Sequence, residues 1–348
     1  MSTKSNPGNF LEDFRQGQIL AHATPKTITE GDVALNIALT GSRYALFSAD
    51  SFAQLCGLPG APIDLLLVFH TVFGKTVPDI SLNAVANLGY AEGRFLAPVY
   101  AGDTLNAVSE VLGVKQNSNG KTGVVTVRTT GFNQDEIPVL SYVRWVMVNK
   151  RDVAADVIDA PPKTPASSVP PADLVLPLGL DFSAYDYALA GSPHAFDDYE
   201  IGERIDHVDG MTVEEAEHQL ATRLYQNTAK VHFDALAQKE SRFGKRLIYG
   251  GVTISIARAL AFNGLANAQL MLAINGGRHV NPLFAGDTLY AWSEVLAKED
   301  LGDIGALRLR LVAVKNKSAT DFPFKNEAGE YDPNVVLDFD YWAAIPKR

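Results

Sequence analysis

Hydrophobic and polar residues alternate along two neighbouring stretches of the chain, residues 124–130 and 139–148. Alternation with a period of two is typical of strands with one buried face, and the turn-rich segment GFNQDE between them predicts a hairpin. Residues 307–314 and 335–341 repeat the pattern with a longer connection, NKSATDFPFKNEAGEYDPN. We therefore expect two hairpins, the second with an insertion long enough to reach over a neighbouring site.

A second pattern, apolar nearly all round, occupies residues 252–262 (VTISIARALAF), and residues 64–74 hold the equivalent place nearer the N-terminus. Such a pattern is typical of a helix that is enclosed by other structure. A helix followed by several strands fits a central helix wrapped by a curved antiparallel sheet. Other α+β arrangements share this order, so the pattern alone does not decide between them.

An internal repeat organises the chain. The segments GRFLAPVYAGDTLNAVSEVL (93–112) and GRHVNPLFAGDTLYAWSEVL (277–296) are identical at 13 of 20 positions with an offset of 184. Gly17 and His22 match Gly202 and His207 with an offset of 185. The chain therefore contains two copies of one domain, predicted at residues 1–152 and 196–348, and the Pro- and Ala-rich segment 153–195 is predicted to be a tether between them.

Composition narrows the classes of function. The 348 residues include 30 Lys and Arg against 40 Asp and Glu, a formal charge of −10, so the chain lacks the excess of cations that a nucleic-acid surface needs. Cys56 is the only cysteine, which excludes an intrachain disulfide and a thiolate metal cluster. No apolar run resembles a signal peptide or a membrane span. We expect a cytoplasmic protein without a nucleic-acid or membrane partner, and an anionic substrate would require a local basic pocket.

The segments APVYAGDTL and NPLFAGDTL resemble the MaoC-like dehydratases. QNTAKVH (226–232) and LIYG (247–250) resemble the signature of R-specific enoyl-CoA hydratases. Over nearly its whole length, including GKTVPDISLNAVANLGYAEGRF, the chain is similar to the mesaconyl-CoA hydratase family.

This resemblance implies an α+β double hot-dog fold, in which each of two tandem hot-dog domains wraps a curved antiparallel sheet around a central helix. It implies a hydro-lyase that reversibly hydrates an acyl-CoA thioester, mesaconyl-CoA, to β-methylmalyl-CoA in the ethylmalonyl-CoA pathway. No metal and no other cofactor is expected, and the chain is expected to form a homodimer or a higher homo-oligomer.

The resemblance also assigns catalytic residues. His232 matches the histidine that activates water, and Gly250 matches the glycine whose backbone N–H donates to the thioester carbonyl and stabilises the developing oxyanion. Asn227 stands where the family has an aspartate, and an amide cannot accept a proton at neutral pH. Either His232 acts alone through a water chain, or a carboxylate from another segment takes over. The candidates for that carboxylate are Asp50, Glu215 and Asp234.

Recognition of mesaconyl-CoA calls for a cation, because the substrate carries a free carboxylate beyond its double bond. The candidate substrate-binding residues are Arg43, Arg223, Lys230 and Tyr249. With an offset of 184, Arg43 and Ser48 of the first copy stand opposite Asn227 and His232. That copy lacks the hydratase pair, so we expect one active site per chain.

Several alternatives remain open. The enzyme could be an R-specific hydratase of straight-chain enoyl-CoA or a hydratase of itaconyl-CoA. A hot-dog thioesterase would release free CoA, and an acyl-CoA-binding protein that has lost its aspartate would leave both the double bond and the thioester intact. Structural roles also fit the motif: a hydrogen-bonded core histidine for His232, a helix cap for Asn227 and a turn before the helix for Gly250.

Overall fold

Both copies contribute to one ten-stranded antiparallel sheet in the computed structural model, which describes residues 4–348. The strand order is β1-β3-β4-β5-β2-β7-β10-β9-β8-β6. The strands of the first copy are β1 (Ile19–Thr27), β2 (Ala84–Phe95), β3 (Thr104–Gln116), β4 (Thr122–Phe132) and β5 (Pro138–Asn149). Those of the second copy are β6 (Arg204–Thr212), β7 (Leu270–His279), β8 (Thr288–Asp300), β9 (Ile304–Lys315) and β10 (Val335–Pro346).

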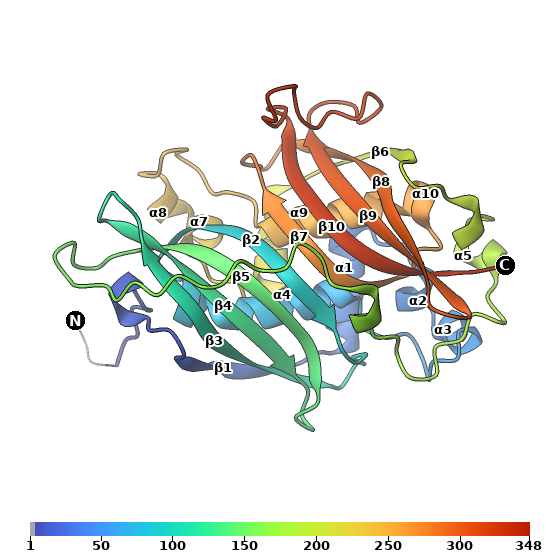
Figure 1. Ribbon diagram of the computed structural model, residues 1–348, viewed down its shortest axis with the longest axis horizontal. Helices are drawn as coiled ribbons and strands as arrows, with labels where there is room; N and C mark the ends of the chain where they lie inside the picture. The colour runs from blue at the N-terminus through green and yellow to red at the C-terminus, as the bar shows by residue number, and fades with distance from the viewer. Residues whose placement is uncertain (1–3) are drawn as a thin grey trace.

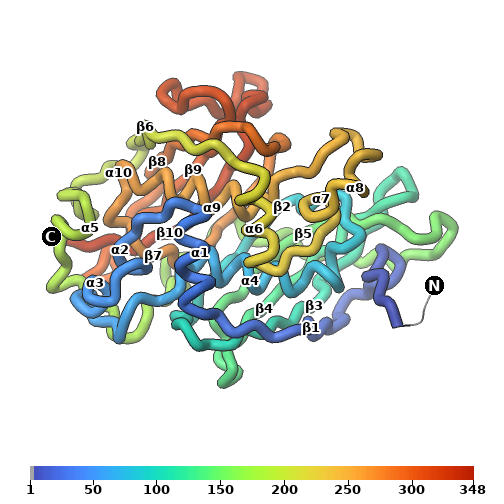
Figure 2. The backbone as a smooth tube through the Cα atoms, turned by 180° about the vertical axis from the view of Figure 1, so that it is seen from behind, coloured from blue at the N-terminus to red at the C-terminus, as the bar shows by residue number. Residues whose placement is uncertain are grey.

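The helices lie on one face of this sheet, as Figure 2 shows from behind. Those of the first copy are η1 (Leu11–Asp13), α1 (Glu30–Thr40), α2 (Ala45–Ser48), α3 (Asp50–Leu55), α4 (Leu65–Thr76) and η2 (Val77–Ser81). Those of the second copy are α6 (Glu215–Leu224), α7 (Lys230–Phe233), α8 (Ala235–Gln238), α9 (Gly250–Leu260) and α10 (Phe262–Leu265).

The two long apolar segments form the central helices, as predicted. All 12 residues of α4 are buried, and so is every residue of α9 after Gly250. Asp64 begins α4 by accepting a hydrogen bond from the backbone N–H of Leu66 (2.8 Å), which satisfies one of the free donors of the first turn. Each helix packs against its own half of the sheet, so the expected double hot-dog fold is confirmed (Figure 1).

The two halves meet at both layers. In the sheet, β2 pairs with β7, and Tyr90 stands opposite Gly277. Between the central helices, Nε2 of His70 lies 2.9 Å from the Ser255 hydroxyl. The seam between the copies is therefore continuous from the sheet to the helices.

The helix boundaries correct one detail of the internal alignment. The pairs α1 and α6, α2 and α7, and α4 and α9 all begin 185 residues apart (215 − 30, 230 − 45 and 250 − 65). The predicted offset of 184 applies only after the central helix, so the pairing of Arg43 and Ser48 with Asn227 and His232 is wrong by one residue. The counterparts are Ser42 and Phe47, which also lack a hydratase pair.

Both predicted hairpins are confirmed, since β4 pairs with β5 and β9 with β10. The prediction that the second connection reaches over a site is wrong. Its Phe322 and Phe324 pack edge-on against Trp292 of β8, and the Trp292 indole N–H donates to the Pro323 carbonyl (3.1 Å). Trp292 belongs to a separate cluster from the core around α9, so these apolar side chains hold the insertion on the outer face of the sheet.

The segment between β5 and β6 contains only short helices, η3 (Pro171–Asp173), α5 (Tyr187–Ala190) and η4 (Phe196–Asp198). It is nevertheless bound to the sheet and crosses the face opposite the long helices (Figure 1). The Val169 N–H donates to the Asn275 side chain (2.8 Å), and the Val169 carbonyl accepts from the Trp342 indole (3.2 Å). None of the helices in residues 4–348 has the length and apolar character to cross a membrane.

Candidate active site

Asn227 shapes the turn that leads from α6 into α7. Its N–H donates to the Thr222 carbonyl (2.9 Å) at the end of α6, and its side-chain oxygen accepts from the Ala229 N–H (3.1 Å) just before α7 begins. The residue is only 1% exposed. A buried amide used in this way forms the turn before the next helix; it is not the helix cap that the sequence left open, because the N-cap of α7 is Ala229 and no side chain caps that end.

His232 is the third residue of the short helix α7, and its protonation follows from its hydrogen bond. Nδ1 lies 2.9 Å from the Leu247 carbonyl, which can only accept, so Nδ1 carries the proton and Nε2 presents a lone pair. Burial lowers the pKa of His232 to about 4, although the bond to Leu247 opposes the shift. The imidazole is therefore neutral at neutral pH and can accept a proton at Nε2.

Gly250 begins α9, and its backbone N–H has no acceptor within the helix. The imidazole of His279, at the end of β7, packs directly on it: a Cβ atom at residue 250 would lie 2.4 Å from the His279 ring. Only glycine permits this approach. Burial, with a smaller contribution from the charge of His232, lowers the pKa of His279 to about 4, so a second neutral imidazole faces the helix N-terminus.

Tyr249 connects these groups. Its backbone N–H donates to Nε2 of His218 (2.9 Å), and its ring lies 5.4 Å from that of His232. Its hydroxyl is 3.5 Å from Nδ1 of His70. Burial raises the pKa of the Tyr249 phenol well above its usual value and lowers the pKa of both His218 and His70 to about 3, so all three side chains are neutral. The predicted residues His232, Tyr249 and Gly250 are thus gathered in one place.

The first copy contributes the other wall of this site. The Tyr90 hydroxyl of β2 lies 3.4 Å from Nε2 of His279, and the Phe73 ring of α4 lies 5.6 Å from that of Tyr249. Arg144 of β5 stands directly opposite Tyr90 in the sheet, and its guanidinium lies 4.2 Å from the centre of the Phe73 ring. The site therefore lies at the seam between the copies.

Sequence reasoning missed His279, Tyr90 and Arg144. His279 falls within the repeated block GRHVNPLFAGDTL, at the position where the first copy has Phe95 (279 − 184), so the difference between the copies was a usable signal. Arg144 sits two residues after Tyr142 on the apolar face of β5, where a charge is out of pattern. No local pattern identified Tyr90.

The predicted cations are on the surface. Arg43 has a side chain that is 60% exposed, and it lies 3.8 Å from the Asp209 carboxylate. Arg223 and Lys230 are exposed on α6 and α7. The structure does not bring Arg43 to the site, because its guanidinium packs on the Phe262 ring (4.6 Å) in another part of the molecule.

The three candidate carboxylates have other partners. Asp50 accepts from the Ala61 N–H (2.9 Å), and Glu215 forms an ion pair with Arg246. Asp234 caps α8 by accepting from two backbone N–H groups (3.0 Å each). Each carboxylate is used to hold the local structure around it.

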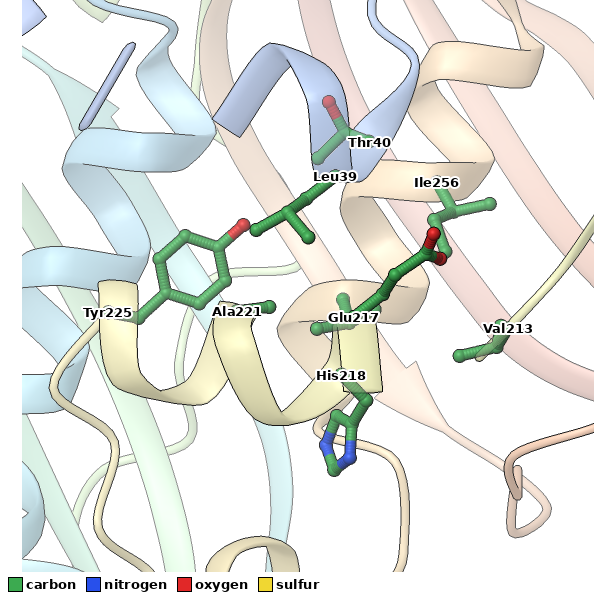
Figure 3. A pocket seen from close by; sticks show the side chains of 9 residues that line it. Leu39, Thr40, Val213, Glu217, His218, Ala221, Tyr225 and Ile256 are labelled. Carbon is green, nitrogen blue, oxygen red and sulfur yellow. The ribbon is translucent and has the colours of Figure 1, made fainter. Parts of the chain in front are cut away.

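A small pocket lies behind the site, between α1, α6 and α9. It is lined by Leu39, Thr40, Val213, Glu217, His218, Ala221, Tyr225, Val252 and Ile256. In Figure 3 the His218 imidazole points away from Leu39 and Thr40, on the other side of α6. The centre of the His218 ring lies 6.3 Å from that of the His232 ring, so this mostly apolar pocket borders the candidate active site through His218.

The fold, together with the similar proteins of known name, makes this chain a hydro-lyase of the MaoC-like double hot-dog class. A crystal structure of a MaoC domain protein dehydratase from Chloroflexus aurantiacus is 60% identical and covers 100% of both chains with a TM-score of 0.97. A Mycobacterium tuberculosis protein described as having a double hotdog fold is 26% identical, with a TM-score of 0.77 and coverage of 97% of this chain and 98% of that one.

Within this class, the chain belongs to the mesaconyl-CoA hydratase family, whose model matches residues 2–323. It is 60% identical over 351 residues to the β-methylmalyl-CoA dehydratase of Chloroflexus aurantiacus, covering 100% of both chains. It is also 60% identical over 346 residues to the mesaconyl-CoA hydratase of Cereibacter sphaeroides, covering 99% of this chain and 100% of the relative. The family and enzyme class expected from the sequence are confirmed.

Proposed function

We propose that this chain reversibly hydrates mesaconyl-CoA to β-methylmalyl-CoA, with His232 as the acid/base residue and Gly250 as the oxyanion donor. The single observation that carries the proposal is the fixed protonation of His232, whose Nδ1–H is held by the Leu247 carbonyl and whose Nε2 is left as an acceptor close to the start of α9. The substrate is taken from the names of the two relatives that are 60% identical, and the ethylmalonyl-CoA pathway follows from that substrate.

The proposed reaction needs one water and one proton shuttle. The water oxygen bonds to the carbon that bears the distal carboxylate while one of its protons passes to Nε2 of His232. The electrons of the double bond move to the thioester oxygen, where the Gly250 N–H stabilises the enolate. The His232 imidazolium then returns its proton to the carbon beside the thioester carbonyl. Water is added, the thioester stays intact, and no metal or redox cofactor takes part.

His279 takes the place of the missing aspartate in this scheme. Asn227 cannot accept a proton, and its side-chain oxygen is already used by the Ala229 N–H. His279 packs on Gly250, is neutral, and has Nε2 within 3.4 Å of the Tyr90 hydroxyl. We assign it the role of orienting the water or the thioester oxygen, while His232 carries the proton.

The segment around His232 also supplies the basic surface that a CoA thioester requires. Residues 223–246 hold six cations against two carboxylates, in a chain whose net charge is −10. The cations are Arg223, Lys230, Lys239, Arg242, Lys245 and Arg246. Except for the ion-paired Arg246 they are exposed, so they are free to meet the phosphates of CoA at the surface.

The test follows the conjugated enoyl-thioester absorbance and the free thiol together, with mesaconyl-CoA and a straight-chain enoyl-CoA as substrates. We expect faster hydration of mesaconyl-CoA, no thiol, and a loss of about 10²-fold or more in His232→Ala, the size typical of a lost acid/base group. The matched control is His194→Ala, an exposed histidine of the segment between β5 and β6, which is expected to keep full activity.

Other outcomes identify the alternatives. Faster hydration of the straight-chain substrate would make the enzyme an R-specific enoyl-CoA hydratase. Release of thiol would make it a thioesterase, and binding without reaction would make it an acyl-CoA-binding protein.

A further inference from the structure

Arg144 differs from the other buried cations in residues 4–348. Lys75, Lys150 and Arg258 all donate to backbone carbonyls, and Arg258 leaves one nitrogen without a partner. Arg144 is fully buried, yet it makes only two hydrogen bonds, both from Nη2, to the hydroxyls of Thr76 (2.7 Å) and Ser81 (3.5 Å). Its Nε and Nη1 have no partner.

The surroundings of Arg144 do not neutralise its charge. No carboxylate of residues 4–348 lies within ion-pair distance of the guanidinium. Besides the two hydroxyls, the groups that interact with it are the Phe73 ring, the neutral phenols of Tyr90, Tyr142 and Tyr249, and the imidazole of His22, which is itself paired with the Asp79 carboxylate (2.7 Å). A buried guanidinium without an anion is costly, so this position is complementary to an anion that enters from outside the chain.

The position of Arg144 relates it to the candidate active site. Its direct neighbour across the sheet, Tyr90, places its hydroxyl against Nε2 of His279, which packs on Gly250. Its stacking partner Phe73 lies against Tyr249, the residue before Gly250. Arg144 is therefore connected to the start of α9, where Gly250 would hold the thioester, by two separate sets of contacts.

The chemistry of the substrate requires a cation at this depth. In mesaconyl-CoA the distal carboxylate is attached to the carbon that receives the hydroxyl group, so it lies inside the site together with the reacting atoms. The side chain of an exposed cation such as Arg43 or Lys230 would have to become buried to contact this carboxylate inside the site. A guanidinium suits a carboxylate better than an ammonium does, because its planar N–H groups match the carboxylate oxygens.

We propose that Arg144 is the specificity-determining residue that binds the distal carboxylate of a dicarboxylic enoyl-CoA through the N–H groups it leaves free. This inference rests on the proposed function. It assigns the first copy, which lacks the hydratase pair, a definite share in the reaction, since Arg144 and Tyr90 come from that copy while His232 and Gly250 come from the other. It also gives a physical reason for an enzyme of this family to prefer a dicarboxylic thioester.

The test uses two substrates that differ only in the distal group, mesaconyl-CoA and 2-methylbut-2-enoyl-CoA, in which a methyl group replaces the carboxylate. We expect Arg144→Met to lower kcat/KM for mesaconyl-CoA by about 10²-fold or more and to change kcat/KM for the methyl analogue by no more than about 3-fold. Arg258→Met, at the other buried arginine, whose guanidinium stacks on the Tyr44 ring, is the matched control and should leave the ratio of the two values unchanged.

Binding measurements separate this proposal from the proposed function. The dissociation constants of both thioesters are measured with His232→Ala and with the double variant His232→Ala/Arg144→Met, so no turnover is needed. A loss of affinity confined to mesaconyl-CoA supports the role of Arg144 even if the wild-type protein proves not to be a hydratase. Hydration by the wild type together with equal affinity losses for both thioesters overturns the role of Arg144 and leaves the function standing.

A purely structural role predicts a different result. If Arg144 only secures the end of α4 through Thr76, then Arg144→Met lowers kcat/KM for both substrates equally, and the inference is wrong. If that variant does not fold by circular dichroism, Arg144→Lys decides, because it keeps the charge and loses the planar N–H groups. A loss confined to mesaconyl-CoA then supports the proposal, and an equal loss overturns it.

Discussion

Replacing Gly250 with alanine adds one methyl group at the point where α9 meets His279. The new Cβ would lie 2.4 Å from Cε1 and Nε2 of the His279 ring, whereas ordinary contacts begin at 3.4 Å. The ring must therefore move by about 1 Å (3.4 − 2.4). Because the ring ends a partly exposed side chain, it can move without unfolding its surroundings, but it then leaves Tyr90 and the start of α9.

The expected result is a separation of stability from activity. Alanine favours the helix over glycine by up to about 1 kcal/mol, which offsets the cost of moving the ring, so the free energy of unfolding should change by no more than about 1 kcal/mol. A misplacement of about 1 Å in an active site can cost about 10²-fold in rate, so kcat for mesaconyl-CoA should fall by that order.

The assay is hydration kinetics and urea unfolding on the same protein samples. Gly31→Ala is the matched control, since residue 31 lies in the first turn of α1 and a Cβ there meets only the Thr29 hydroxyl at 3.5 Å. The reasoning is refuted if Gly250→Ala keeps kcat within about 3-fold of Gly31→Ala, because neither His279 nor the packing on Gly250 would then matter to the reaction.

Two further predictions concern stability. Burial lowers the pKa of six of the seven histidines, so between about pH 6.5 and 4 the unfolded chain binds protons that the folded chain excludes. The stability that these neutral histidines provide is complete above about pH 6.5 and is lost as the pH falls. An equal midpoint of urea unfolding at about pH 5 and at about pH 7.5 would contradict this prediction. Asn227→Ala removes the acceptor of the Ala229 N–H, so it should lower the free energy of unfolding by about 1–2 kcal/mol and lower kcat by displacing α7. Asn227→Asp keeps the acceptor and should lose less stability. Equal losses for the two variants in urea unfolding would disprove the turn role of Asn227.

Much of the fold was predictable because it is local. The alternating and all-apolar patterns identified both hairpins and both central helices, and the repeated block identified the two copies. The sequence shows the length of the insertion between β9 and β10, but not where the insertion packs. Its position was predicted wrongly because its attachment to Trp292 depends on which face of β8 that side chain occupies.

The candidate site divides in the same way. Asn227, His232 and Gly250 lie within 24 residues of one another, so a motif could identify them, and the resemblance supplied their roles. The three predicted cations were chosen from residues near that motif or aligned with it, and the one-residue error in the internal alignment added Arg43 to them. The sequence gives the charge of a residue but not whether its side chain is buried, and the structure shows that all three predicted cations are exposed.

The sequence by itself determined that this protein is a duplicated hot-dog hydratase with one set of motif residues. Only the tertiary structure brings Tyr90 and Arg144 of the first copy, and His279 at the end of β7, next to the motif residues. Tyr90 and His279 are 189 residues apart, and they meet because β2 pairs with β7 across the seam. That pairing depends on the packing of two complete domains, and no local pattern of hydrophobic and polar residues encodes it.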